Sequence, residues 1–248
     1  MAVLSESQIR AKMGSDFEFY APRALRIRTK EGAVLPFELN QAQRYLHGCL
    51  EKQIAEKGRV RALILKGRQQ GASTYTEGRY YWKVSHRIGV KAFILTHEKE
   101  ATNNLFDMVV RYHELCPAPF RPSTKASNSK ELEFDRLDSG YRVGTAGNKG
   151  VGRSSTIQYF HGSEVAFWPH ADEHAKGVMQ AIPDLPGTEV ILESTANGIG
   201  NYFYSQCMLA LDGESDYELI FIPWYWQEEY RKPVPDDFVL SKEEAELI

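Results

Sequence analysis

Several features that narrow a protein's class are scarce in this sequence. Its three cysteines, Cys49, Cys116 and Cys207, are too widely spaced for a zinc motif or a disulfide framework, and this usage is typical of a reducing compartment. No apolar run reaches the roughly 18 residues of a membrane-spanning helix, and the N-terminus lacks the apolar stretch of a signal peptide. The sequence therefore predicts neither a secreted disulfide scaffold nor a protein with a membrane partner.

An excess of charge of either sign is also missing. The formal net charge is −3, which excludes a protein that binds nucleic acid through an overall positive charge. The net charge does not exclude a local basic groove. Hydrophobic residues make up 42% of the 248 positions, enough to bury a sizeable core in one large domain or two small ones. No internal repeat or low-complexity tract suggests another architecture.

Short apolar runs alternate with helical patterns along most of the chain. Strands are predicted over 60–65, 90–96, 155–161, 189–193 and 217–222, and helices over 5–13, 41–57, 75–86, 99–115, 171–181 and 201–211. Asp138, Ser139 and Gly140 predict a hairpin within 131–145. This order is typical of an α/β fold with a mostly parallel central sheet flanked by helices.

The two terminal segments lack the alternating strand and helix patterns of the central part of the chain. Residues 1–36 are predicted to form an N-terminal arm that is irregular over 16–36, with one strand near 25–28. Residues 37–230 are predicted to form the main domain. Residues 231–248 are Pro-rich and acidic, which predicts a tail or linker. The aromatic stripe of the 75–86 helix (Tyr75, Tyr80, Tyr81, Trp82) favours core packing over a base-stacking platform.

The stretch 63–74 (LILKGRQQGAST) has the layout of a phosphate-binding loop. An apolar strand leads into a small-residue loop and then a helix, an order in which backbone N–H groups converge on an anion. Against G-x-x-x-x-G-K-[ST], Gly71 and Ser73 fit, Ala72 replaces the lysine and Lys66 replaces the first glycine. Lys66 or Arg68 could reach the phosphates instead. An ordinary strand-to-helix turn with a polar loop has the same layout.

Four loops follow the carboxyl ends of predicted strands: 66–74, 96–98, 162–164 and 193–198. Ligands of such sheets bind at this edge, so we expect the four loops to form one site. Glu164 is placed to activate water, although a solvated carboxylate or a helix cap has the same signature. Ser163 stands where a Mg²⁺-organising aspartate is expected and could hold a metal-bound water. Ser194 and Thr195 could sense the γ-phosphate, or simply serve as turn residues.

A Gly-rich basic loop over 145–154 adds further cations. Lys149 and Arg153 could face a neighbouring subunit's nucleotide as an arginine finger, or contact DNA phosphates. Arg142 is a lesser candidate for the same roles.

Three segments in this order resemble the ATPase motor of tailed-bacteriophage terminase large subunits: 67–74 (GRQQGAST), 162–168 (GSEVAFW) and 193–198 (ESTANG). The resemblance covers about residues 37–226 and implies a P-loop NTPase fold of the ASCE/RecA-like type. It implies that Arg68, with Lys66 as second choice, supplies the cation of an altered Walker A loop and that Glu164 is the catalytic glutamate of Walker B. Ala72 and Ser163 depart from the family's usual lysine and aspartate.

The resemblance assigns the remaining residues as well. The coupling motif is matched by Ser194, Thr195 and Ala196, and the basic residue before Walker B is matched by Arg153. Gln43 matches the adenine-reading glutamine, and Gln41 is the alternative for that role. The nucleotide-binding set is Gln43, Lys66, Gly67, Arg68, Gln69, Gln70, Gly71, Ala72, Ser73 and Thr74, and the metal set is Ser73, Ser163 and Glu164.

By the same resemblance, the chain hydrolyses ATP with Mg²⁺ and drives double-stranded DNA into a procapsid in the host-cell cytoplasm. Its partners would be the portal protein, the small terminase subunit and copies of itself in a ring, with a monomer when isolated. No nuclease activity is expected, since the chain stops in what resembles the linker to that domain. Two other interpretations remain open: a nucleotide-binding switch with little hydrolysis, and a small-molecule kinase, for which no acceptor pocket is evident.

Overall fold

A central sheet of eight strands organises the chain in the computed structural model, which describes residues 4–146, 156–230 and 233–246. The strand order is β10 (Glu218–Ile222), β3 (Val60–Lys66), β9 (Glu189–Ser194), β8 (Tyr159–Ser163), β4 (Lys91–Thr96), β7 (Ser139–Thr145), β6 (Glu131–Phe134) and β5 (Thr124–Ser127). The six strands from β10 to β7 are parallel, and β6 and β5 extend the sheet antiparallel. The predicted mostly parallel α/β sheet is confirmed.

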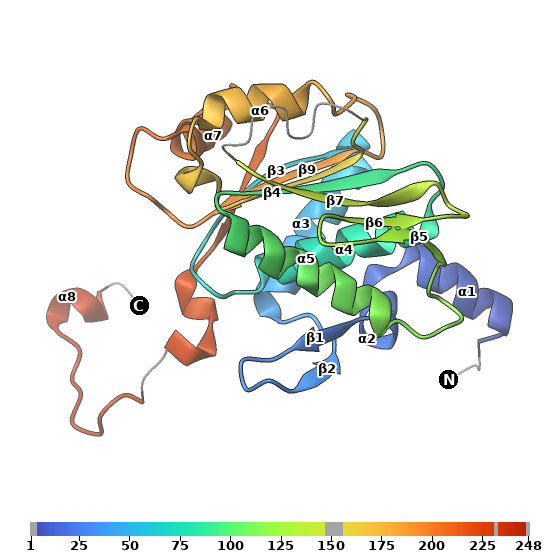
Figure 1. Cartoon of the computed structure of the whole chain (residues 1–248). Coiled ribbons are helices and arrows are strands. Elements are labelled where there is room, and N and C mark those ends of the chain that lie inside the picture. The colour runs from blue at the N-terminus through green and yellow to red at the C-terminus, as the bar shows by residue number, and fades with distance from the viewer. Residues whose placement is uncertain (1–3, 147–155, 231–232, 247–248) are drawn as a thin grey trace.

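Helices cover both faces of this sheet (Figure 1). On one face lie α3 (Gln41–Lys57), α4 (Ala72–His86) and α5 (Lys99–Glu114), and on the other α6 (Ala171–Met179) and α7 (Tyr202–Leu211). Because strand side chains alternate, Ile64 of β3 belongs to one core cluster and Leu63 to the other. The strands therefore read as continuous apolar runs in the sequence. Among the described residues, no helix has the length and apolar character to cross a bilayer.

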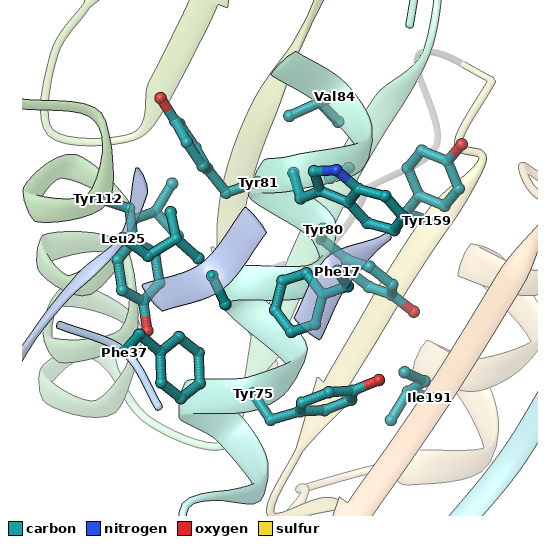
Figure 2. Packing of buried hydrophobic residues seen from close by; sticks show 14 of the residues in the cluster. Phe17, Leu25, Phe37, Tyr75, Tyr80, Tyr81, Val84, Tyr112, Tyr159 and Ile191 are labelled. Atoms are coloured by element: carbon teal, nitrogen blue, oxygen red, sulfur yellow. The ribbon is translucent and has the colours of Figure 1, made fainter. Parts of the chain in front are cut away.

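The aromatic stripe of α4 forms the centre of the larger core (Figure 2). Tyr75, Tyr80 and Tyr81 are fully buried and Trp82 nearly so. Their polar atoms are satisfied inside the protein: Tyr80 Oη donates to the carbonyl of Phe160 at 3.1 Å. The stripe is core, as predicted, and offers no surface to a nucleic-acid base.

The segment 16–36 corrects the sequence prediction of an irregular arm. It forms helix α2 (Phe17–Ala24), capped by the side chain of Asp16, and a hairpin of β1 (Arg26–Arg28) and β2 (Val34–Pro36). Pro22 lies inside α2 and argued against a helix, but burial of Phe17 against Trp82 of α4, with ring centroids 5.6 Å apart, favours it. Tertiary packing overrides the local signal here.

Other boundaries shift by smaller amounts. Strand β8 spans Tyr159–Ser163, so it ends directly before Glu164. Of the predicted strand 155–161, residues 156–158 precede β8, and residue 155 lies outside the described residues. Strand β5 and the short helix α8 (Lys242–Ala245) were not predicted. The first helix, α1, runs over Glu6–Ser15 and begins at Ser5 in a capping box, as expected.

A buried ion cluster ties α4 to the amino end of β9. The carboxylate of Glu189, fully buried, accepts from Arg79 Nε and Nη2, both at 2.9 Å, and lies 2.5 Å from Lys83 Nζ. Burial alone would raise the pKa of Glu189, but the two cations outweigh it and hold that pKa at about 2.

We expect Glu189→Gln to lower the free energy of unfolding by about 3 kcal/mol, measured by urea denaturation, because two buried cations lose their shared anion. This value is at the lower end of the loss expected when a buried ion pair is broken, because both cations are partly compensated. Arg79 still pairs with Glu51 at 2.6 Å, and Lys83, whose pKa is lowered to about 8, can release its proton. Glu56→Gln, which removes an exposed carboxylate that pairs with Lys52 at 3.9 Å, is the control and should change the free energy of unfolding by less than about 0.5 kcal/mol. Equal denaturation midpoints for the two variants would contradict a stabilising role for the cluster.

Candidate functional site

The four strand-end loops meet at one edge of the sheet, as predicted. They surround a cavity of about 310 Å³ between the ends of β3, β4, β8 and β9. Its lining residues are Lys66, Arg68, Gln69, His97, Glu164, Phe167 and Thr195. Each of the four loops contributes at least one of these side chains.

The loop between β3 and α4 is held in shape by the N-terminus of α3. Gln43 Nε2 donates to the carbonyl of Gly71 at 2.9 Å, and Asn40 Nδ2 donates to the carbonyl of Gln70 at 3.3 Å. Gly71 is the N-cap of α4 with φ +78°, and a Cβ there would lie 2.5 Å from the Gln43 amide. The positive φ favours glycine at this position, and a larger residue would also displace the Gln43 amide from its bond to the loop.

Gln43 is thus closely tied to the loop, although not by an evident nucleobase contact. Its Oε1 accepts from the backbone N–H of Asn40 at 3.0 Å, so both ends of the amide bond to the protein itself. Adenine reading by Gln43 would require these bonds to exchange. The rival Gln41 is exposed at the start of α3.

The segment after β10 holds the beginning of the loop. The buried Gln70 side chain donates through Nε2 to the carbonyl of Pro223 at 2.5 Å, and Tyr230 Oη donates to the carbonyl of Arg68 at 2.9 Å. A Cβ at Gly67 would lie 3.0 Å from the backbone of Trp224, so the two segments pack backbone to backbone. The loop is fixed from both sides before any ligand binds.

The two cations of the loop occupy different environments. Lys66 is nearly buried, and its Nζ lies 3.1 Å from Glu164 Oε1 and 3.7 Å from Glu193 Oε2. Burial disfavours its charge, but these two carboxylates outweigh burial and raise the pKa of Lys66. Arg68 is exposed on the cavity rim and forms no ion pair within the described part of the chain. Of the two cations of the loop, Arg68 is thus the one whose charge no carboxylate of the described residues neutralises.

Glu164 lies at the junction of β8 and the short helix η1 (Val165–Phe167), in a left-handed conformation with φ +53°. Its Oε2 accepts from the backbone N–H and the hydroxyl of Thr195, both at 3.2 Å, and from Ser194 Oγ at 3.4 Å. The predicted catalytic glutamate and two of the predicted coupling residues are therefore in direct contact. Ala196, the third coupling residue, is exposed just beyond them.

A second carboxylate, Glu193, was not assigned a role from the sequence. It ends β9 fully buried, and its Oε1 accepts from Ser73 Oγ, from Ser163 Oγ at 3.2 Å and from His161 Nε2 at 3.1 Å. Burial favours the neutral acid, yet Lys66 and these donors hold the pKa of Glu193 at about 2. The signal that could have found Glu193 is a charged residue at the end of an otherwise apolar buried strand.

His161 connects Glu193 to the interior of the protein. Its Nδ1 bonds to Glu77 of α4, and Glu77 also accepts from Tyr141 Oη at 2.9 Å. Burial disfavours imidazolium, but the two carboxylates outweigh it and raise the pKa of His161 to about 9. His161 is therefore charged at neutral pH and braces Glu193.

No group of three or more His, Cys, Asp or Glu side chains in the described ranges could hold a metal by itself. Mg²⁺ is typically bound by one or two carboxylates together with substrate phosphates. Ser73 at the start of α4 bonds to Glu193, and Lys66 pairs with both Glu193 and Glu164, so oxygens of this kind are present at the site. The residues present therefore fit Mg²⁺ that arrives with a phosphate ligand.

The remaining predicted cations lie elsewhere. Arg142 of β7 pairs with Glu133 at 2.9 Å and with Glu131 at 3.5 Å, which favours a structural role at the sheet. Lys149 and Arg153 lie outside the described residues. His97 and Phe167, which line the cavity, were not predicted as site residues.

No family model matches the sequence, and no curated protein matches it. Solved structures do match. The large terminase of bacteriophage HK97 aligns with a TM-score of 0.67 over 94% of this chain and 46% of that protein, at 14% identity. The large terminase ATPase domain of Thermus phage P74-26 aligns with a TM-score of 0.54 over 69% of this chain and 79% of that domain, at 18% identity.

The large terminase of the thermophilic bacteriophage D6E, in complex with ATP-γ-S, gives a TM-score of 0.54 over 78% of this chain and 47% of that protein, at 12% identity. The chain thus spans about half the length of the HK97 and D6E proteins. It has the fold of phage large terminase ATPase domains.

Proposed function

We propose that this chain, which has the fold of phage large terminase ATPase domains, hydrolyses ATP to move double-stranded DNA into a procapsid. One observation carries the proposal: the preformed loop 66–74, Glu164 and Thr195 meet around one cavity at the carboxyl edge of the sheet. A phosphate cradle, a carboxylate that can activate water and a hydroxyl that can report on the γ-phosphate are the parts such a reaction needs.

The residues divide the work as follows. The N-terminus of α4 and the backbone of 67–74 hold the phosphates, and Arg68 contacts them with its exposed guanidinium. When bound, Mg²⁺ would offset the charge of the phosphates, held through Ser73 with Ser163 and Glu164 nearby. Glu164 orients water and accepts its proton. Thr195 and Ser194, which bond to Glu164, transmit the change at the γ-phosphate to the segment that follows.

The assembly around this site is proposed from the same resemblance. Residues 37–230 would form the ATPase domain, residues 1–36 an N-terminal arm, and residues 231–248 a tail or a linker toward a nuclease domain. Copies would form a ring at the portal protein with the small terminase subunit, in the host-cell cytoplasm. Arg153 of one copy would face the nucleotide of its neighbour, so the isolated chain would be a weakly active monomer.

A second function has one specific observation in its favour. Ala72 leaves the helix start without the usual lysine, and the nearest buried cation, Lys66, already bonds to Glu164. A chain arranged this way could bind nucleotide and hydrolyse it slowly, as a switch or an assembly scaffold.

The test is ATP hydrolysis by the chain at low and high protein concentration, with and without double-stranded DNA, alongside binding of ATP measured by calorimetry. A motor completed by a neighbour's residue should turn over faster per subunit as concentration rises, and faster again with DNA. The DNA effect should fall steeply with salt, because the contacts are to phosphates.

Each other outcome rejects a defined part of the proposal. Binding with no turnover under any of these conditions favours the switch. Turnover that ignores DNA and protein concentration argues for an ordinary ATPase acting on another partner. Absence of ATP binding rejects the nucleotide site altogether.

A further inference from the structure

The buried carboxylate at the end of β9 lies one strand away from where a P-loop enzyme usually carries its metal-organising acid. In such enzymes a Walker B aspartate fills that role, and here the position is Ser163 on β8. Ser163 and Glu193 are direct register partners on adjacent parallel strands. Strand β9 lies between β8 and β3. Glu193 therefore places a carboxylate level with Ser163 but one strand nearer the phosphate loop.

The contacts of Glu193 put this carboxylate beside the expected metal ligand. Ser73 in the first turn of α4 occupies the position whose hydroxyl binds Mg²⁺ in P-loop proteins. Its Oγ donates to Glu193 Oε1, and Ser163 Oγ reaches the same oxygen at 3.2 Å. The small side chain of Ser163 leaves space for the longer glutamate that arrives from β9.

The second oxygen of Glu193 is the independent sign of a ligand. Glu193 is fully buried, and Oε2 has no hydrogen-bond donor among the described residues. Lys66 Nζ lies 3.7 Å from Oε2, beyond hydrogen-bond range. A buried carboxylate oxygen without a donor is uncommon, and a bound ion is one of the arrangements that accounts for it. Because Oε1 already accepts three bonds, Oε2 is the oxygen available to a cation.

The support behind Glu193 resembles the outer shell of a metal site. His161 Nε2 donates to Oε1 of Glu193, and Nδ1 of the same ring bonds to Glu77, so the orientation of the Glu193 carboxylate is fixed. Partners of this kind orient metal-binding carboxylates. The side chain of Glu189, at the other end of the same strand, pairs with the cations Arg79 and Lys83 of α4, far from the loop.

From this geometry we infer that Glu193 supplies the carboxylate that holds the nucleotide-bound Mg²⁺ together with Ser73. The inference rests on the proposed nucleotide site and refines it: the metal acid has moved from β8 to β9, with Ser163 making room for it. Glu164 is then left for water.

The test compares ADP binding in Mg²⁺ and in EDTA, by calorimetry, for the unsubstituted chain and Glu193→Gln. The unsubstituted chain should bind more tightly with Mg²⁺. In Glu193→Gln this gain should shrink by about tenfold or more, the order lost when metal-site groups are removed. In EDTA the variant should bind ADP as tightly or more tightly, because a negative charge beside the phosphates has been removed.

Two further variants complete the design. Glu218→Gln makes the same change of charge on β10, at the far end of a strand that also adjoins β3, and should keep the full Mg²⁺ gain. Glu193→Asp keeps the charge but withdraws it by one methylene. If Glu193→Gln does not fold, as judged by its circular dichroism spectrum, a reduced Mg²⁺ gain in Glu193→Asp supports the inference and an unchanged gain overturns it.

The remaining outcomes separate this inference from the function on which it rests. A full Mg²⁺ gain in folded Glu193→Gln, or an equal loss of affinity in Mg²⁺ and EDTA, overturns the inference and leaves the nucleotide site standing. Failure of the unsubstituted chain to bind ADP under both conditions rejects the proposed function and the inference together.

Discussion

Glu164→Gln is expected to lower the rate of ATP hydrolysis by about 10²- to 10⁴-fold, the usual contribution of a positioned general base. The amide keeps the shape of the side chain and can still accept from Thr195, whose N–H and hydroxyl both lie 3.2 Å from Oε2. Nucleotide affinity should therefore stay within about threefold of the unsubstituted value. Hydrolysis is measured at saturating ATP, so that the two effects are separated.

The control neutralises a carboxylate in the neighbouring strand-end loop. Glu98, which pairs with His97 at 3.4 Å, is not among the residues that line the cavity. Glu98→Gln should hydrolyse ATP at close to the unsubstituted rate. A Glu164→Gln variant that keeps its rate would show that another group activates water, and a variant that loses ATP binding would show that Glu164 acts through the shape of the site.

The fold could be predicted from the sequence because its strands are buried on both faces. Runs such as 62–65 are apolar without interruption, since Leu63 and Ile64 pack into opposite cores. The position of the site followed from the rule that parallel strands present their carboxyl ends at one edge. Glu164 could be found in this way, because it follows its strand directly and needs no knowledge of the neighbouring strands.

The contacts of the site that were not predicted depend on which strands are neighbours in the sheet. Nothing in the sequence states that β9 adjoins both β3 and β8, so the contact of Glu193 with Ser73 was out of reach. The ion pairs of Lys66 with Glu164, which follows β8, and with Glu193, which ends β9, were hidden for the same reason. Helix α2 was missed for a different cause: Pro22 signals a break locally, while the burial that stabilises the helix comes from α4.

Lys66→Met is expected to lower the free energy of unfolding at pH 7 by about 3–5 kcal/mol, the usual result of removing one partner from a buried ion cluster. Lys66 Nζ lies 3.1 Å from Glu164 and 3.7 Å from the fully buried Glu193, and methionine supplies no charge to either. Arg68→Met is the matched control, because Arg68 is exposed and forms no ion pair within the described ranges. It should leave stability nearly unchanged while weakening the binding of nucleotide.

The pH dependence of the deficit tests its electrostatic origin. The folded-state pKa of Glu193, about 2, lies below its ordinary value of 4.5, so its contribution to stability is present above about pH 4.5 and is lost as the pH falls toward 2. Without Lys66 that pKa should rise, because burial favours the neutral acid. The difference between Lys66→Met and the unsubstituted chain should therefore be largest near pH 7 and shrink between pH 4.5 and 3, as measured by urea denaturation. A deficit that stays constant over this range would mean that Lys66 stabilises the site by packing of its aliphatic chain, and equal losses in Lys66→Met and Arg68→Met would remove the distinction between the two cations.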